Sequence, residues 1–349
     1  MGCPNPNTDY TSFDGLDPSL NYDSISIDGA TYPTIWIGAQ KWMAVNLDFD
    51  KSITNITNTV QWRSANVPGI CFYNNDSTEL TCVKGALYNW FALPIITSGV
   101  SSTGFKIPTL ADFNELTAYL TSLGITGVNQ GHALRSNSPS LTDYWDSSTA
   151  TNYTGFSAIG SGWRNWDTAY DFRYIKGGAD APNAYFWLDD STTPRWVYIQ
   201  DNGAVTTNTG GTAYKRAGFS VRLLIPSVQV NLVIHGYEVG DTVDISGNYV
   251  DGTISDTFIS NGFIKLRHGE NVNIQCFAGA GRIATITALN GLTINNQGTA
   301  SASGTYINSG NGLLTPITLE VTFSIPPLDP FLIVENNINF ERGGYLVPV

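Results

Sequence analysis

The chain has 349 residues, of which 42% are hydrophobic and 13% are charged, and its formal net charge is -12. This composition excludes a disordered chain, because disorder goes with low hydrophobicity and high charge. The acidity and the lack of a Lys/Arg cluster exclude nucleic acid and anionic lipid as partners, since both require a basic surface. No apolar run approaches the roughly 20 residues that span a bilayer, so we expect no membrane insertion.

The length suits two domains of ordinary size. We expect an N-terminal arm at residues 1–20, a mixed domain at 21–225, an all-β domain at 226–325, and an apolar segment at 326–349 that docks on a partner or on the all-β domain. The start of the chain has neither the basic residues nor the apolar stretch of a signal peptide. Either a signal has been removed, or the protein reaches the exterior without one, as a phage particle does on lysis.

The four cysteines are too few for a disulfide scaffold. Cys71 and Cys82 enclose a polar loop that a single bridge could close, and such a bridge contributes about 3 kcal/mol by restricting the unfolded chain. Cys276 lies in an apolar, strand-like run and is expected to be a buried thiol. Cys3 is either an ordinary free cysteine, which we favour, or the lipid-bearing cysteine of a trimmed lipoprotein.

The mixed domain opens with a predicted β-hairpin. Apolar residues on either side of Asp28-Gly29 form two short strand-like runs, the second of which ends at Gly38. A short aromatic helix is predicted at residues 85–92, and Pro94 is expected to stop it.

A second helix is predicted to begin at Thr109, whose hydroxyl can cap the backbone N–H of Asp112 while that carboxylate lies in the first turn. Gly124 ends it, and its apolar face is made by Phe113, Leu116, Leu120 and Leu123. Beyond Gly124 the helical periodicity stops. A long irregular stretch rich in Trp, Tyr, Gly and Asn continues to about residue 185, and so long an irregular segment in a compact domain is usually functional.

A hairpin with Asn202-Gly203 as its tight turn follows, and residues 219–223 are predicted to close the sheet. Pro226 marks a domain boundary. Beyond Pro226, apolar residues alternate at period two and Asn-Gly turns recur, without a helical pattern. This spacing predicts an antiparallel β-sandwich of about 100 residues.

Seven short blocks in the mixed domain follow a familiar order. They are Asp28–Tyr32 with Ile35–Gly38 and Gln40, Trp42–Ala44 with Asn46-Leu47, Tyr73–Asp76 between Cys71 and Cys82, Gly85 with Leu87–Trp90, Gly104–Thr109, Gly155–Ala158 with Gly162–Arg164, and Gly218–Arg222. Together they resemble the Fibrobacter succinogenes major paralogous domain, a family of bacterial surface and phage proteins related to the C-type-lectin and sulfatase-modifying-factor folds.

The resemblance covers about residues 20–225 and implies an α+β, C-type-lectin-like domain with two helices, small sheets and a long variable loop region. It implies no particular ligand. Cys71 and Cys82 match the family's structural cysteine pair, whereas Leu223 stands where the family has a further cysteine, so a second bridge is absent. A Trp-Ser-Ser-Thr-like turn of the family is replaced at residues 187–192.

Metal and redox sites are not predicted. The stretch Ala181-Pro182-Asn183 lacks the carboxylate of a sugar-binding calcium site, and Asp189-Asp190 is too close to it in sequence for the lectin arrangement. We therefore expect no cofactor, with calcium as the alternative. Cys71 and Cys82 do not match the reactive pair of the copper-dependent relatives. The histidines, at positions 132, 235 and 268, lack metal-ligand spacing.

A glycan-cleaving enzyme remains the alternative to a non-enzymatic protein, because loop carboxylates are numerous. Those that could form a catalytic pair are Asp143, Asp146, Asp167, Asp171, Asp189 and Asp190. Unpaired carboxylates on surface loops are the commoner case, so we predict no enzyme.

Aromatic and arginine residues concentrate between residues 163 and 198, and such side chains supply rigid contact area in binding patches. About half of the rings should be core, in particular Trp163, Trp187 and Tyr198. We predict a ligand-binding surface made of Trp166, Tyr170, Arg173, Tyr174, Tyr185, Asp189, Asp190, Arg195 and Trp196.

The leading hypothesis is a non-enzymatic bacteriophage virion surface protein, whose lectin-like domain binds a host glycan or protein receptor. In this hypothesis the C-terminal region attaches it to other virion proteins, and the protein is a homo-oligomer. The alternative is a bacterial cell-surface adhesin or lipoprotein, and a purely structural decoration is also open.

Overall fold

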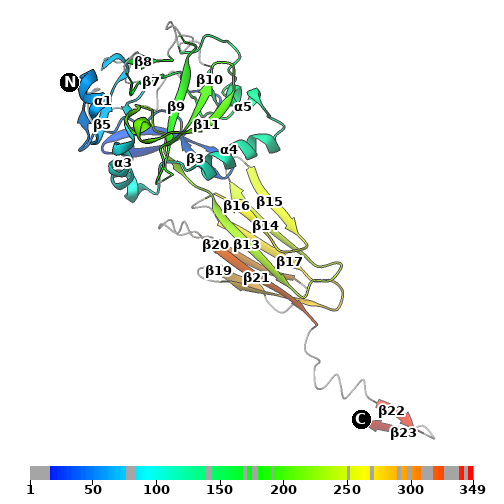
Figure 1. The fold of residues 1–349 in the computed structure, drawn as a ribbon. Helices are drawn as coiled ribbons and strands as arrows, with labels where there is room; N and C mark the ends of the chain where they lie inside the picture. Colours follow the sequence, from blue (N-terminus) through cyan, green and yellow to red (C-terminus); the bar gives the residue numbers. More distant parts are fainter. Residues whose placement is uncertain are drawn as a thin grey trace. The chain divides into compact units, whose positions relative to one another are not determined.

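A computed structural model describes residues 16–75, 84–137, 144–167, 171–174, 180–190, 192–249, 252–267, 271–288, 292–296, 301–307, 317–325, 338–341 and 345–348. The chain divides into two compact units, Met1–Ser227 and Val228–Val349, and the division falls beside Pro226. The protein is rich in short strands and has few helices (Figure 1). The finer assignment of residues 21–225 as C-type-lectin-like stays a prediction.

The first sheet of the first unit joins the two ends of that unit. Its strands are β1 (Asp23–Ile27), β2 (Ala30–Ile37), β3 (Gln40–Met43) and β12 (Leu224–Ile225), in that order. The predicted hairpin is confirmed: β1 and β2 are antiparallel, and both Asp28 and Gly29 at their turn have positive φ. Because β12 pairs with β3, the last strand of the unit lies against its first hairpin.

The helices differ from the prediction in number and position. Those observed are α1 (Thr59–Ser64), α3 (Leu93–Val100), α4 (Leu110–Ser122) and α5 (Val128–Leu134). Both α1 and α5 went unpredicted, because six or seven residues are too few to show a helical period.

The prediction of a helix at residues 85–92 is wrong. Leu87 and Tyr88 form β6, which joins β4 (Thr54–Asn55) and β5 (Gly69–Cys71) in a three-stranded sheet, and a 3-10 turn, η2, spans Trp90–Ala92. The helix α3 starts only at Leu93. Pro94 therefore lies in the first turn, where its missing N–H costs no hydrogen bond, and it begins a helix instead of stopping one.

The start of α4 is as predicted. The Thr109 side chain accepts from the backbone N–H of Asp112, and the Asp112 carboxylate accepts from the backbone N–H of Thr109, which makes a capping box. Gly124, with φ 78°, follows the helix end.

A three-stranded sheet of the first unit (Figure 1) contributes side chains to two hydrophobic clusters. Its strands are β9 (Asn183–Leu188), β10 (Arg195–Gln200) and β11 (Val205–Thr209), and Gly203 with φ 83° lies in the predicted turn between β10 and β11. Alternate residues of β9 face opposite sides: Tyr185 and Trp187 enter one hydrophobic cluster, and Ala184, Phe186 and Leu188 enter the other. All six residues of β9 are buried for this reason.

Residues 218–225 do not close this sheet as a single strand. Isolated bridges join Gly218, Phe219 and Ser220 to three separate segments, and only β12 forms a regular pair, with β3. Gly218 exchanges backbone hydrogen bonds with Arg164, Phe219 with Tyr88, and Ser220 with residues 185 and 187, so the segment passes from one neighbour to the next.

Arg222 is a fully buried charge that ties loops to the core. It is 1% exposed and donates to Asn46 Oδ1 at 2.9 Å and to the carbonyl oxygens of Phe156 and Ser157. Its guanidinium lies 4.4 Å from the ring centre of Phe156. Burial lowers the pKa of Arg222 to about 9, so the side chain still carries its charge at neutral pH and uses it in hydrogen bonds.

Two other buried arginines act in the same way. Arg164 donates to the carbonyl oxygens of residues 56 and 57 and lies over Trp62, 4.5 Å from its ring centre. Arg135 donates to the carbonyl oxygens of residues 200 and 201. The irregular segments of the first unit are thus fixed by side-chain donors, because they have no strand ladder to satisfy their carbonyl groups.

The second unit is a β-sandwich. One sheet has the order β16-β13-β21-β18 and the other β15-β14-β17-β20-β19. The strands are β13 (Val228–His235), β14 (Thr242–Tyr249), β15 (Gly252–Phe258), β16 (Gly262–Leu266), β17 (Asn271–Phe277), β18 (Ile283–Ala288), β19 (Leu292–Asn296), β20 (Ser301–Ile307) and β21 (Ile317–Ser324).

Both sheets contribute to the sandwich core, with Leu232, Ile286 and Val321 from one and Val243 and Ile274 from the other. One pairing departs from the predicted antiparallel pattern, because β13 and β21 are parallel. They are far apart in sequence, so no tight turn dictates their relative direction. A last pair of strands, β22 (Ile338–Glu341) and β23 (Tyr345–Pro348), is antiparallel. The predicted docking role of residues 326–349 stays a prediction.

Candidate functional site

Five partly exposed aromatic side chains lie over one layer of buried rings in the first unit. We call them the aromatic cluster: Trp163, Trp166, Tyr174, Tyr198 and Tyr214. They come from β7 (Trp163–Arg164) and the residues after it, the end of β8 (Phe172–Arg173), β10, and the 3-10 helix η5 (Thr212–Arg216). Segments far apart in sequence therefore meet at this surface.

The supporting layer consists of Tyr185, Trp187, Trp196 and Phe219, each at most 7% exposed. Tyr198 stacks on Tyr185 with ring centres 5.1 Å apart, and Tyr214 stacks on Trp196 at 5.0 Å. Aromatic pairs at such separations contribute roughly 0.5–1.5 kcal/mol each beyond the area they bury. The exposed rings are consequently held in place before any ligand arrives.

The prediction of which rings are buried is right for Trp187 and wrong for several others. Tyr185 and Trp196 were predicted at the surface, but they are only 7% and 5% exposed. Strand pairing explains this burial. Tyr185 pairs with Tyr198, and Trp187 pairs with Trp196, across β9 and β10, so all four side chains project from the same face of the sheet into one hydrophobic cluster. Tyr198, expected in the core, is partly exposed.

The other rings of this region agree with the prediction only in part. Trp163 was also expected in the core and is partly exposed, whereas Trp166 and Tyr174 are partly exposed as predicted. Tyr170 lies outside the described residues. Tyr214 was missed, because it lies in a short 3-10 helix whose sequence gives no sign that it contacts Trp166, 5.0 Å away between ring centres.

Tyr174 has a backbone conformation that is rare for an aromatic residue. Its φ is 61°, in the left-handed region, which costs of order 1–3 kcal/mol. The backbone N–H of Asn183 donates to the Tyr174 carbonyl oxygen at 3.0 Å, and the Arg173 guanidinium lies 5.0 Å from the Tyr174 ring centre. These contacts hold the strained residue so that its ring packs on Tyr185.

Three of the four charged residues predicted to bind ligand, Arg173, Asp190 and Arg195, already have partners within the protein. Arg173 donates to both carboxylate oxygens of Asp180, at 2.9 and 3.1 Å, and these hydrogen bonds raise the pKa of Arg173. Arg195 Nε lies 3.2 Å from Asp190 Oδ2, a charge contact without hydrogen-bond geometry. Asp189 is partly buried at the end of β9. The surface thus presents rings more than free charges.

The calcium alternative finds little support in the positions of its candidate ligands. Asn183 begins β9 and donates to the Tyr185 hydroxyl at 3.2 Å, whereas Asp189 and Asp190 follow the other end of that strand, about 20 Å away at the usual rise per residue. In the described ranges, no three His, Cys, Asp or Glu side chains come together as a metal site would require.

Two of the candidate catalytic carboxylates, those of Asp167 and Asp171, are engaged in structural contacts. Asp171 accepts from Arg63 at 2.8 Å and from the hydroxyl of Thr59, and Asp167 accepts from the side chain of Asn165 at 2.8 Å. Asp143 lies outside the described residues. The absence of enzymatic activity stays a prediction.

Cys71 is a free thiol buried at the end of β5, with 0% exposure. Burial raises the pKa of Cys71 to about 11, so the thiol is protonated and unreactive at neutral pH. Cys82 lies outside the described residues, and the structure therefore does not show the predicted bridge. Cys276 is a buried free thiol, as predicted.

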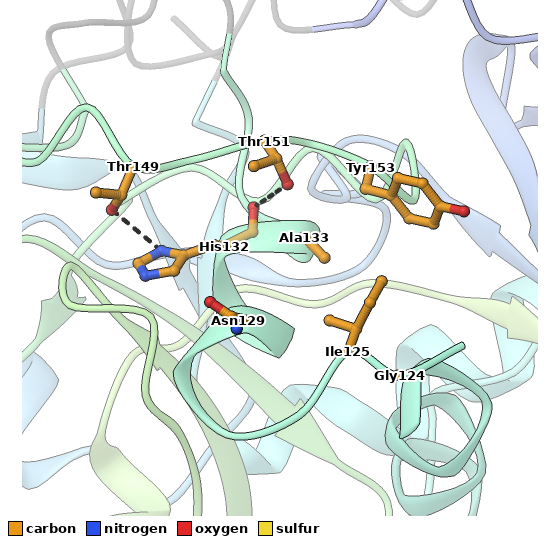
Figure 2. Close-up of a pocket in the computed structure, with 8 residues that line it drawn as sticks. All are labelled: Gly124, Ile125, Asn129, His132, Ala133, Thr149, Thr151 and Tyr153. Carbon is orange, nitrogen blue, oxygen red and sulfur yellow. Dashed lines mark hydrogen bonds between the residues drawn. The ribbon is translucent and has the colours of Figure 1, made fainter. Parts of the chain in front are cut away.

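A pocket of about 620 Å³ lies elsewhere in the first unit, beside α5 (Figure 2). Its polar end has Thr149, His132 and Asn129, and its apolar end has Ile125 and Tyr153. Thr149 Oγ1 and His132 Nδ1 share a hydrogen bond of 3.1 Å. This pocket was not predicted from the sequence, because α5 itself was not predicted.

No helix in the described part of the chain is long and apolar enough to cross a membrane.

Comparison with solved structures finds two crystal forms of a bacterial adhesin from Mobiluncus mulieris that contains intramolecular disulfide, isopeptide and ester cross-links. The identities are 13% and 14%, and the TM-scores are 0.21 and 0.20. The match covers 38% of this chain in both cases, and 58% and 56% of the adhesin chains. No curated protein matches this chain.

The family comparison is decisive for the first unit. The sequence profile of the Fibrobacter succinogenes major domain matches residues 35–224, which is more than half of the chain and runs from β2 to the first residue of β12. This match confirms the resemblance found in the sequence motifs. The chain belongs to the Fibrobacter succinogenes major domain family.

Proposed function

We propose that this protein is a non-enzymatic adhesion protein of a bacterial cell surface, in which a C-type-lectin-like first unit binds a glycan or protein through the aromatic cluster. The second unit, a β-sandwich, would attach or space the first. The observation that carries this proposal is the set of partly exposed rings held on a buried aromatic layer.

Preorganised aromatic side chains suit binding because they provide large contact area with little conformational entropy to lose. Trp and Tyr faces also stack on the apolar faces of sugar rings. The ion pairs of Arg173 and Arg195 within the protein favour a ligand recognised by shape and stacking over one recognised by charge.

A bacterial cell surface is preferred to a phage particle as the location. The virion hypothesis rested on the start of the chain, the low content of charged residues and the family resemblance, and the last two suit a cell surface equally well. The low content of charged residues, 13%, suits either exterior location. Self-association and attachment through the C-terminal region are parts of the same proposal.

The test is binding of the full-length protein to a glycan array and to whole bacterial cells, with and without chelator. We expect saturable binding that Trp166→Ala weakens by about tenfold or more. Tyr237→Ala is the matched control, because Tyr237 is an exposed tyrosine, 38% accessible, in the second unit.

Three outcomes would count against parts of the proposal. Equal binding by Trp166→Ala and the unaltered protein would remove the aromatic cluster from the binding site. Loss of binding with chelator would restore the calcium alternative. The location can be tested by probing cell and phage-particle fractions with an antibody. Detection of the native protein only in phage particles would overturn the cell-surface location.

A further inference from the structure

The pocket beside α5 is a second place in the first unit with the properties of a ligand site. Its volume of about 620 Å³ lies within the range usual for small-molecule sites. None of the eight lining residues drawn in Figure 2 is Asp, Glu, Lys or Arg. Among the lining residues that the structure describes, a ligand of this pocket therefore meets hydroxyl, amide, imidazole and aromatic groups and no charged side chain.

The ring of Tyr153 at the apolar end is held outward by a rigid turn. Tyr153 is 60% exposed, although its neighbours Asn152 and Thr154 are 0% and 8% exposed. Asn152 has φ 48°, and its side chain accepts from the Ser157 backbone N–H and donates to the Ser157 hydroxyl, both at 2.9 Å. Asn adopts the left-handed region more readily than other side chains do, and this hydrogen-bonded turn leaves the large Tyr153 ring in water.

The helix beneath the pocket is equally fixed. The turn between β10 and β11 lies so close to α5 that a side chain at Gly203 would meet the Val128 carbonyl oxygen and the His132 ring. The Asp201 carboxylate accepts from the backbone N–H groups of residues 146 and 147 at 2.9 and 3.0 Å, and Arg135 donates to the Asp201 carbonyl oxygen. The pocket is thus formed before a ligand binds, which lowers the entropy cost of binding.

The polar end retains hydrogen-bonding capacity. In the part of the chain that the structure describes, His132 uses only Nδ1 of its ring, and the side-chain amide of Asn129 has no hydrogen-bond partner. Burial, and to a lesser degree the nearby Arg135, lower the pKa of His132 below its usual 6.5, so the ring is neutral at pH 7. Both groups can accept or donate hydrogen bonds.

We propose that this pocket binds a neutral sugar unit, with its apolar C–H face on the Tyr153 ring and its hydroxyl groups hydrogen-bonded to Asn129 and His132. A pyranose combines an apolar face with hydroxyls that both donate and accept, and this combination matches the two ends of the pocket. A carboxylated or phosphorylated ligand would find no cation among the described residues of the lining. The site is separate from the aromatic cluster and goes beyond the proposed function.

Saturation-transfer NMR on the full-length protein tests this proposal, with the methyl glycosides of glucose, galactose, mannose and N-acetylglucosamine as probes and glucuronic acid as the charged comparison. We expect transfer to the ring C–H protons of at least one neutral glycoside. Tyr153→Ala and Asn129→Ala should each weaken its binding at least about fivefold. Tyr153→Phe, which keeps the ring, and Tyr237→Ala, in the second unit, should bind like the unaltered protein.

The proposal is overturned if no neutral glycoside gives a signal, if Tyr153→Ala binds as well as the unaltered protein, or if glucuronic acid binds as tightly as the neutral glycosides. Trp166→Ala separates the two sites. If that variant loses the signal while Tyr153→Ala retains it, the sugar lies on the aromatic cluster, which would support the proposed function and reject the pocket. The reverse result supports the pocket.

Discussion

In the second unit, strand alternation alone supplies the core, with residues such as Val243, Ile245 and Ile274 facing inward from neighbouring strands. In the first unit, much of the chain is irregular, and three fully buried arginines supply the hydrogen bonds that strand ladders supply elsewhere. Irregular backbone can be buried only if its carbonyl groups find donors. The loops that carry the aromatic cluster and the pocket therefore depend on a few specific side chains, whereas the sandwich depends on a repeated pattern.

The largest effect should come from Arg222→Met. The change removes donors to two carbonyl oxygens and to Asn46 Oδ1, all buried, and should cost about 3–5 kcal/mol of unfolding free energy. Arg222→Lys should recover only part of this loss, because a single ammonium group cannot copy the guanidinium fork.

Each unit contains a buried thiol that can report its unfolding separately. Peptide-resolved mass spectrometry of thiol labelling should show Cys71 exposed in Arg222→Met while Cys276 remains protected. Labelling of Cys276 to the same extent as Cys71 would show that the two units do not unfold separately.

The complementary change is Ile274→Ala in the sandwich. Ile274 is 1% exposed in the centre of the second core, and truncation of such a residue costs about 2–5 kcal/mol, depending on how far the cavity collapses. We expect Cys276 to become labelled at lower denaturant concentration and Cys71 to be unaffected. Ile274→Val, at roughly 0.5–1.5 kcal/mol, is the conservative control.

The free thiol of Cys71 makes the stability of the first unit depend on alkaline pH. Its pKa is raised by burial from 9.0 to about 11, so between these values the unfolded chain loses the proton and the folded chain keeps it. Stability is therefore complete below pH 9 and falls as the pH rises toward 11, by about 2–3 kcal/mol in total.

The measurement is the difference in unfolding free energy between the unaltered protein and Cys71→Ala, taken from about pH 8 to about pH 11 in steps of about one pH unit. The shared tyrosines cancel in this difference. If Cys71 is instead bridged to Cys82, it has no proton to lose, and the difference will be constant with pH.

The parts that could be predicted from sequence are those whose signals are local. The Asp28-Gly29 turn, the Thr109 cap and the period-two strands of the sandwich each depend on residues close together in the chain. The aromatic cluster was located only in part, because burial of Tyr185 and Trp196 follows from which strands pair. The pocket depends on contacts between α5 and the turn at Gly203, about 70 residues later, which no local pattern reveals.

The smallest effect should come from Thr109→Ala, which tests a structural feature of the first unit that the local sequence defines. The change removes the side-chain cap of α4 and leaves the Asp112 backbone N–H without its acceptor, at a cost of about 1 kcal/mol. For a unit of this size that cost lowers the Tm by about 2–4 °C in a calorimetric scan. Thr109→Ser keeps the hydroxyl and should restore the Tm. Since α4 also packs Phe113 and Leu116 into the core, a loss as large as that of Arg222→Met would mean that the cap, and not this packing, holds the helix in place.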